Sequence, residues 1–127
     1  EDKFREVESK LLKEVGTFEN VIVSTGGGTP CFYDNIEFMN QSGKTIYLKA
    51  KAQTLANRLI ANRDKRPLVK EKSENELLSF ISDNLEKREK FYLQATHTYD
   101  TDNVIETDIK KFTSEMINSL KLDLYEN

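Results

Sequence analysis

The sequence predicts an α/β domain: a parallel sheet with helices on both faces, three layers in all. Three observations support this fold class. Short runs rich in β-branched and aromatic residues alternate with longer segments whose apolar residues recur every three or four positions. The run Asn20–Ser24 is continuously apolar at its centre, which is typical of a strand buried on both faces of a parallel sheet. At 127 residues, the chain is long enough for one domain, residues 1–127, and too short for two.

The first elements are assigned from apolar spacing and from glycine. Residues 1–15 are predicted to form an amphipathic helix that Gly16 ends. The strand Asn20–Ser24 then leads directly into Gly26–Gly28. A helix over residues 31–40 is expected to follow Pro30.

The remaining elements follow the same logic. Residues 62–72 are polar and contain Pro67, so we interpret them as a mobile segment within the domain. Ser73 and Glu76 fit a capping box that begins a long helix. The predicted elements are a strand over 44–50, a helix over 52–62, a helix over 73–94, a third strand over 96–101 and a last helix over 106–122.

Composition excludes several classes of function. The net charge is −3, from 19 basic and 22 acidic residues that are interspersed, so we expect no nucleic-acid partner. No apolar run approaches the roughly 20 residues of a membrane helix, so we expect no membrane partner. The lone Cys31 suits a reducing cytoplasm and is expected to be a packing residue. His97 has no neighbouring His or Cys, so no metal site is predicted.

Gly43-Lys44-Thr45 superficially matches the end of a nucleotide-binding P-loop. The motif requires a glycine where Phe38 stands and a helix after the threonine. Residues 46–48 are instead predicted to be a strand, so we do not assign phosphate binding to this tripeptide.

Two motifs in the first third of the chain suit the binding of a small anion. Gly26, Gly27 and Gly28 follow a predicted buried strand and would expose backbone amides at the sheet edge where ligands bind, although a simple turn would have the same sequence. Arg5 is suited to bidentate contact with a carboxylate, and Glu8, one helical turn on, is suited to orienting Arg5. The alternative is that both residues lie on a solvated helix face.

Two further motifs contain positively charged side chains. Arg63 and Arg66, with Lys65, lie in the polar segment and suit a lid that closes on phosphates, or else a solvated loop. Arg88 lies late on the long predicted helix, in Arg88–Tyr92, where surface charge is the alternative interpretation.

In their order along the chain, the four motifs resemble the shikimate kinases, P-loop kinases whose fold is related to that of nucleoside monophosphate kinases. The resemblance implies that Arg5 and Arg88 grip the shikimate carboxylate and that Gly26–Gly28 bind shikimate through backbone amides. It also implies that Arg66 acts on ATP and the transferring group as the catalytic lid arginine. Arg63 is similar to a second ATP-binding lid arginine that often precedes it in the family.

The family also has features that this sequence does not contain. A P-loop, with its Mg²⁺-binding Ser or Thr, and an acidic motif that binds shikimate hydroxyls are expected upstream of Glu1. The P-loop strand would lie between strands 20–24 and 45–48, so we expect residues 1–127 alone to fold poorly and to bind no ATP. Some members carry an adenine-contacting arginine after the last strand, where residues 101–105 offer none.

The resemblance implies a cytoplasmic, monomeric enzyme of chorismate and aromatic amino acid biosynthesis that uses ATP and Mg²⁺. Two alternatives stay open. One is a non-catalytic fragment that binds a small anionic polyol or a partner chain, and the other is a related kinase acting on another polyol such as gluconate.

Overall fold

The computed structural model describes residues 1–62 and 72–126, with side chains for 1–62 and 72–121. Most of the predicted mobile segment 62–72 therefore lies outside the described residues. The elements in chain order, with η marking 3₁₀ helices, are α1 (Asp2–Val15), η1 (Thr29–Cys31), α2 (Asn35–Ser42), β1 (Ile46–Lys49), α3 (Ala52–Ala61), α4 (Glu74–Tyr92), β2 (His97–Asp100), η3 (Glu106–Asp108) and α5 (Ile109–Glu126).

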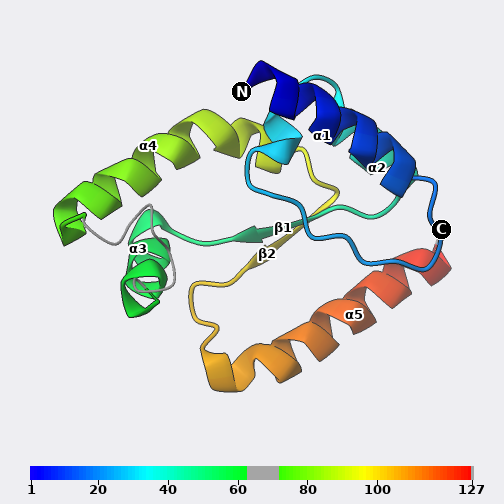
Figure 1. The fold of residues 1–127 in the computed structure, drawn as a ribbon. Coiled ribbons are helices and arrows are strands. Elements are labelled where there is room, and N and C mark those ends of the chain that lie inside the picture. Colours follow the sequence, from blue (N-terminus) through cyan, green and yellow to red (C-terminus); the bar gives the residue numbers. More distant parts are fainter. Residues whose placement is uncertain (63–71, 127) are drawn as a thin grey trace.

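The sheet of the described residues consists of β1 and β2, which pair in parallel with Ile46 opposite His97 and Lys49 opposite Asp100. These are two of the three predicted strands, and their pairing confirms the parallel α/β class. Figure 1 shows α1 and α2 on one side of the strands and α5 on the other. Just before β1, the Thr45 hydroxyl bonds Asn40 and Thr96, and a strand follows, so Gly43-Lys44-Thr45 does not begin a helix.

The prediction of a buried strand over Asn20–Ser24 is wrong for the described structure. The segment runs as an irregular trace between α1 and η1, outside the sheet (Figure 1). Ile22 is 99% exposed, and Val21 and Val23 are each 50% exposed. β-branched residues favour a strand that is covered by neighbouring elements, and no described segment pairs with this run.

The predicted helix 31–40 begins late. The 3₁₀ helix Thr29–Cys31 comes first, and Tyr33 then adopts a left-handed backbone with φ of 51°, which no α-helix tolerates. The helix α2 therefore begins only at Asn35. This break produces the compact turn after the triple glycine.

The helix α1 is fixed against α2 by three contacts. A methyl group at Gly16 would collide with the Phe38 ring, so this glycine allows close packing and does not serve as a left-handed cap. Lys13 forms an ion pair with Asp34 at 2.9 Å. Together with a bond from Ser9 to Asn35 of α2, described below, these contacts hold the second half of α1 against α2.

The helices α3 and α4 pack on each other through Ala56, Leu77 and Ile81, which form the buried apolar cluster of the described residues. Leu77 is fully buried, which contributes about 1.5–3 kcal/mol relative to an exposed side chain. The predicted Ser73 cap is confirmed, since its hydroxyl accepts from Glu76 N at 3.2 Å. This packing anchors α4, whose last turns reach the candidate site.

Candidate functional site

The triple glycine forms the rim of a tight turn. Thr29 N donates to Gly26 O at 3.2 Å, and Cys31 N donates to Gly28 O at 3.0 Å. Gly28 is buried and caps the N-terminus of η1 with ordinary right-handed dihedrals. The backbone of this turn is thus ordered by its own hydrogen bonds, as a binding loop requires.

Arg5 lies directly against this turn. A methyl group on Gly28 would stand 2.5 Å from Arg5 Nη2 and 2.8 Å from Nη1, so the guanidinium occupies the space that a side chain would take. Because positions three apart share a helix face, Glu8 reaches the same group and pairs with Nη1 at 2.8 Å. The Arg5 and Glu8 side chains are only 15% and 17% exposed.

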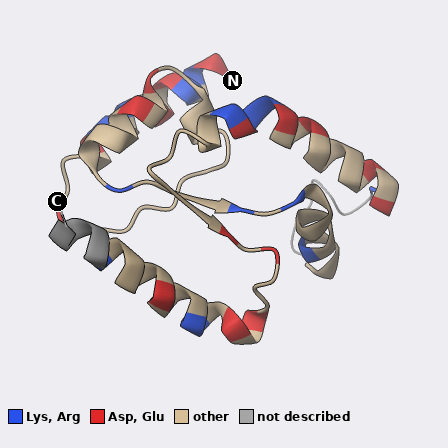
Figure 2. Ribbon diagram, turned by 180° about the vertical axis from the view of Figure 1, so that it is seen from behind, with Lys and Arg blue, Asp and Glu red and all other residues tan. Residues whose placement is uncertain are grey.

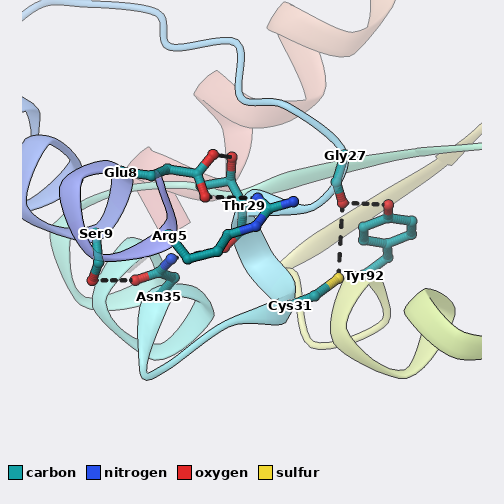
Figure 3. Close-up of polar contacts among 8 residues, drawn as sticks. All are labelled: Arg5, Glu8, Ser9, Gly27, Thr29, Cys31, Asn35 and Tyr92. Carbon is teal, nitrogen blue, oxygen red and sulfur yellow. Dashed lines mark hydrogen bonds and ion pairs between the residues drawn. The ribbon is translucent and has the colours of Figure 1, made fainter. Parts of the chain in front are cut away.

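Glu8 also ties the arginine to the turn. Its second carboxylate oxygen accepts from Thr29 Oγ1 at 2.8 Å (Figure 3). The orienting role that the sequence predicted for Glu8 therefore has a second anchor. No local pattern indicates the bond to Thr29, because the two residues are 21 positions apart.

The Arg5 guanidinium also lies near two aromatic rings, and one of its N–H groups has no hydrogen-bond partner among the described residues. Its carbon lies 4.2 Å from the centre of the Phe32 ring and 5.1 Å from that of Phe4. Its Nε is buried and has no hydrogen-bond partner among the described residues. Buried polar groups are normally paired, so this N–H is a natural donor for a bound anion.

Arg88 and Tyr92 reach the turn from α4. A methyl group on Gly27 would lie 3.2 Å from Arg88 Nη1 and 3.3 Å from Tyr92 Oη. The two side chains are one helical turn apart and share a face. Burial raises the pKa of Tyr92, partly offset by Arg88, so its hydroxyl stays a donor at neutral pH and bonds Gly27 O at 2.5 Å.

Two cations from different helices thus converge on adjacent glycines, Arg5 on Gly28 and Arg88 on Gly27. Figure 2 shows the basic positions near the end of α4 beside those of α1. A planar anion with hydroxyl groups would find guanidinium groups and backbone amides here. The structure brings together five of the predicted site residues: Arg5, Gly26, Gly27, Gly28 and Arg88.

The other predicted site residues, Arg63 and Arg66, lie outside the described residues. In the part of the chain with described side chains, no group of three or more His, Cys, Asp or Glu could hold a metal ion. The predicted contacts of Arg63 and Arg66 with phosphate stay predictions.

Cys31 lies at the edge of the site, with Sγ 3.8 Å from Gly27 O. Burial raises the pKa of the thiol, and the opposing effect of Arg88, Arg5 and Lys90 is smaller. The neutral thiol is a poor nucleophile, so the structure agrees with a packing residue.

Sequence reasoning missed the residue beneath the turn. Asn35 is fully buried, donates to Thr29 O at 2.8 Å and accepts from Ser9 Oγ at 2.8 Å (Figure 3). It links α1, α2 and the turn in one network. Asn35 lies in the middle of the predicted helix 31–40, so nothing in its local sequence marks this tertiary role.

It also missed Arg58 of α3. Its guanidinium donates to Thr101 and to the carbonyl of Val104. Residues 101–105 contain no arginine of their own, but Arg58 contacts them from α3. Asp102 accepts from Lys51 N at 2.7 Å and Thr54 Oγ1 at 2.8 Å, which lowers its pKa. These bonds tie the end of β2 to the start of α3.

Comparison with known proteins places this arrangement. A family model described as shikimate kinase matches residues 1–121. The chain belongs to the shikimate kinase family. The shikimate kinase of Parabacteroides distasonis is 46% identical over 121 residues, which are 94% of this chain and 70% of that protein. The shikimate kinase of Azobacteroides pseudotrichonymphae is 53% identical over 97 residues, 76% of this chain and 57% of that protein.

A solved structure agrees. The crystal structure of the shikimate kinase from Bacteroides thetaiotaomicron superposes with a TM-score of 0.88 at 43% identity, covering 95% of this chain and 69% of that one. The shared fold confirms the predicted P-loop kinase class. None of the helices with described side chains is long and apolar enough to cross a membrane.

Proposed function

We propose that the protein phosphorylates shikimate with ATP, forming shikimate 3-phosphate for chorismate and aromatic amino acid synthesis. The observation that carries the proposal is the convergence of Arg5 and Arg88 on Gly28 and Gly27. Shikimate is a small carboxylate with ring hydroxyls, and this site offers guanidinium groups for the former and amides for the latter.

In this proposal, Arg5 and Arg88 bind the carboxylate, and Gly26–Gly28 bind the hydroxyls. The partly buried pair with Glu8 keeps the Arg5 guanidinium in place, and its buried Nε has no hydrogen-bond partner among the described residues. Phosphoryl transfer depends mainly on positioning and charge neutralisation, which such a rigid clamp supplies on the acceptor side.

ATP is the proposed donor, and Arg66, assisted by Arg63, is proposed to neutralise charge on the transferring phosphoryl group. Mg²⁺ is the proposed accompanying ion. The described residues form no fitting cluster for it, so we assign no metal ligand and derive no step through it. We also propose a cytoplasmic monomer without nucleic-acid partners, in line with the mixed, mildly acidic charge.

The test is an assay of ADP release by the intact native protein, with shikimate and with gluconate. Shikimate-dependent turnover is expected, and turnover with gluconate alone would contradict the proposal. Binding of shikimate without any turnover would favour the non-catalytic alternative. Arg66→Ala is expected to lower kcat more than shikimate affinity, and unchanged turnover would remove its proposed role.

A further inference from the structure

Tyr92 has no role in the function proposed above, yet it makes the contact that joins α4 to the glycine turn. Its hydroxyl donates to Gly27 O across 65 positions of sequence (Figure 3). It projects from the same helix face as Arg88, one turn further on. One rigid element therefore carries both a proposed carboxylate ligand and the anchor of the loop.

The bond fixes an adjacent amide. A peptide unit is planar and trans, so the carbonyl of Gly27 and the N–H of Gly28 point in opposite directions. Holding the carbonyl toward Tyr92 aims the Gly28 N–H away from α4. That N–H makes no hydrogen bond among the described residues, so it is a donor left for a ligand.

Tyr92 is itself held in place. Its ring lies 5.2 Å from that of Tyr47 on β1, at an interplanar angle of 47°. Tyr47 in turn donates to Glu89 Oε2 at 2.7 Å, on the same helix as Tyr92. The Tyr92 ring is thus supported by a residue of β1 that is itself bonded to α4.

We propose that Tyr92 is a positioning residue for substrate binding: it sets the spacing between the Arg88 guanidinium and the Gly28 amide. The proposal rests on the proposed function, because the ligand it serves is shikimate. Tyr92 acts through the loop and does not itself touch the substrate.

The test is Tyr92→Phe in the intact native protein, which removes one oxygen and keeps the ring packed on Tyr47. Losing a neutral hydrogen bond predicts that the dissociation constant for shikimate rises roughly 3- to 10-fold. The KM for ATP is expected to stay within twofold. Tyr99→Phe is the matched control, since Tyr99 packs edge-on against Phe112, away from the turn.

The outcomes separate the possibilities. A purely structural role would lower the melting temperature and weaken both ligands alike, which would overturn the proposal, as would unchanged shikimate affinity. In an Arg88→Ala background, Tyr92→Phe is expected to cost less than in the wild type, because the spacing it sets has lost one end. A wild-type protein that binds no shikimate would instead refute the proposed function.

Discussion

Gly28→Ala tests the clamp with the smallest possible change. The backbone at Gly28 has φ of −86° and ψ of −18°, which alanine adopts without strain. The new methyl carbon would stand 2.5 Å from Arg5 Nη2, whereas ordinary contacts begin near 3.4 Å. The guanidinium must therefore shift by up to about 1 Å, which disturbs its 2.8 Å bond to Glu8.

The cost falls on function more than on stability, because the displaced atoms end a flexible side chain. A misplacement of about 1 Å lowers rates by up to roughly 100-fold, so we expect shikimate kcat/KM to fall 10- to 100-fold. That range corresponds to about 1.4–2.7 kcal/mol. The KM for ATP and the melting temperature are expected to change little.

Two other glycines grade the effect. At Gly26 the added carbon would lie 3.6 Å from Thr29 Oγ1, an ordinary contact, so Gly26→Ala is expected to cost less. At Gly43 nothing lies within 4 Å and φ is 176°, so Gly43→Ala serves as the control outside the site. Steady-state kinetics with each substrate varied would measure all three. Equal losses for Gly28→Ala and Gly43→Ala would refute the reasoning.

Three further predictions follow from the same geometry. Arg5→Ala and Arg88→Ala should each weaken shikimate binding by about 2–5 kcal/mol, because a desolvated anion loses a partner; calorimetric titration should show nucleotide binding spared, and intact shikimate affinity in both would contradict the assignment. Cys31 has a raised thiol pKa, so its alkylation should be slow at pH 7, accelerate as the pH rises past the usual thiol range, and slow again with shikimate bound; fast alkylation at pH 7 would oppose the burial. The isolated polypeptide 1–127 should unfold without a sharp transition, since its described sheet has two strands and Val21–Val23 are exposed; a cooperative melt with micromolar ATP affinity would overturn this.

The fold could be predicted from the sequence where local patterns decide the outcome. The apolar periodicity of α1 and α4, and the Ser73 cap, act within a few residues and were placed correctly. The segment Asn20–Ser24 could not be decided in this way. A β-branched run specifies that a strand is favourable, but pairing depends on a neighbour elsewhere in the chain.

The site shows the same limit. Arg5, Arg88 and the glycines were found because their order along the chain resembles a family, not because any of them is distinctive alone. Asn35 and Arg58 escaped notice, and Tyr92 was named only as the end of the Arg88–Tyr92 motif, with no role. Each acts through a hydrogen bond to backbone that is remote in sequence. No local pattern encodes such a bond.

The proposed substrate site depends on hydrogen bonds between residues that are remote in sequence. The residues proposed to touch shikimate are cations and glycines on three separate segments, and none fixes its own position. Asn35 holds the turn to α1 and α2, Glu8 holds Arg5 to the turn, and Tyr92 holds the turn to α4. Each of these bonds crosses between elements, so the precision of the clamp lies in groups that contact the loop and not the ligand. Conservative substitutions at these three positions should therefore alter shikimate affinity while every proposed ligand group is still present.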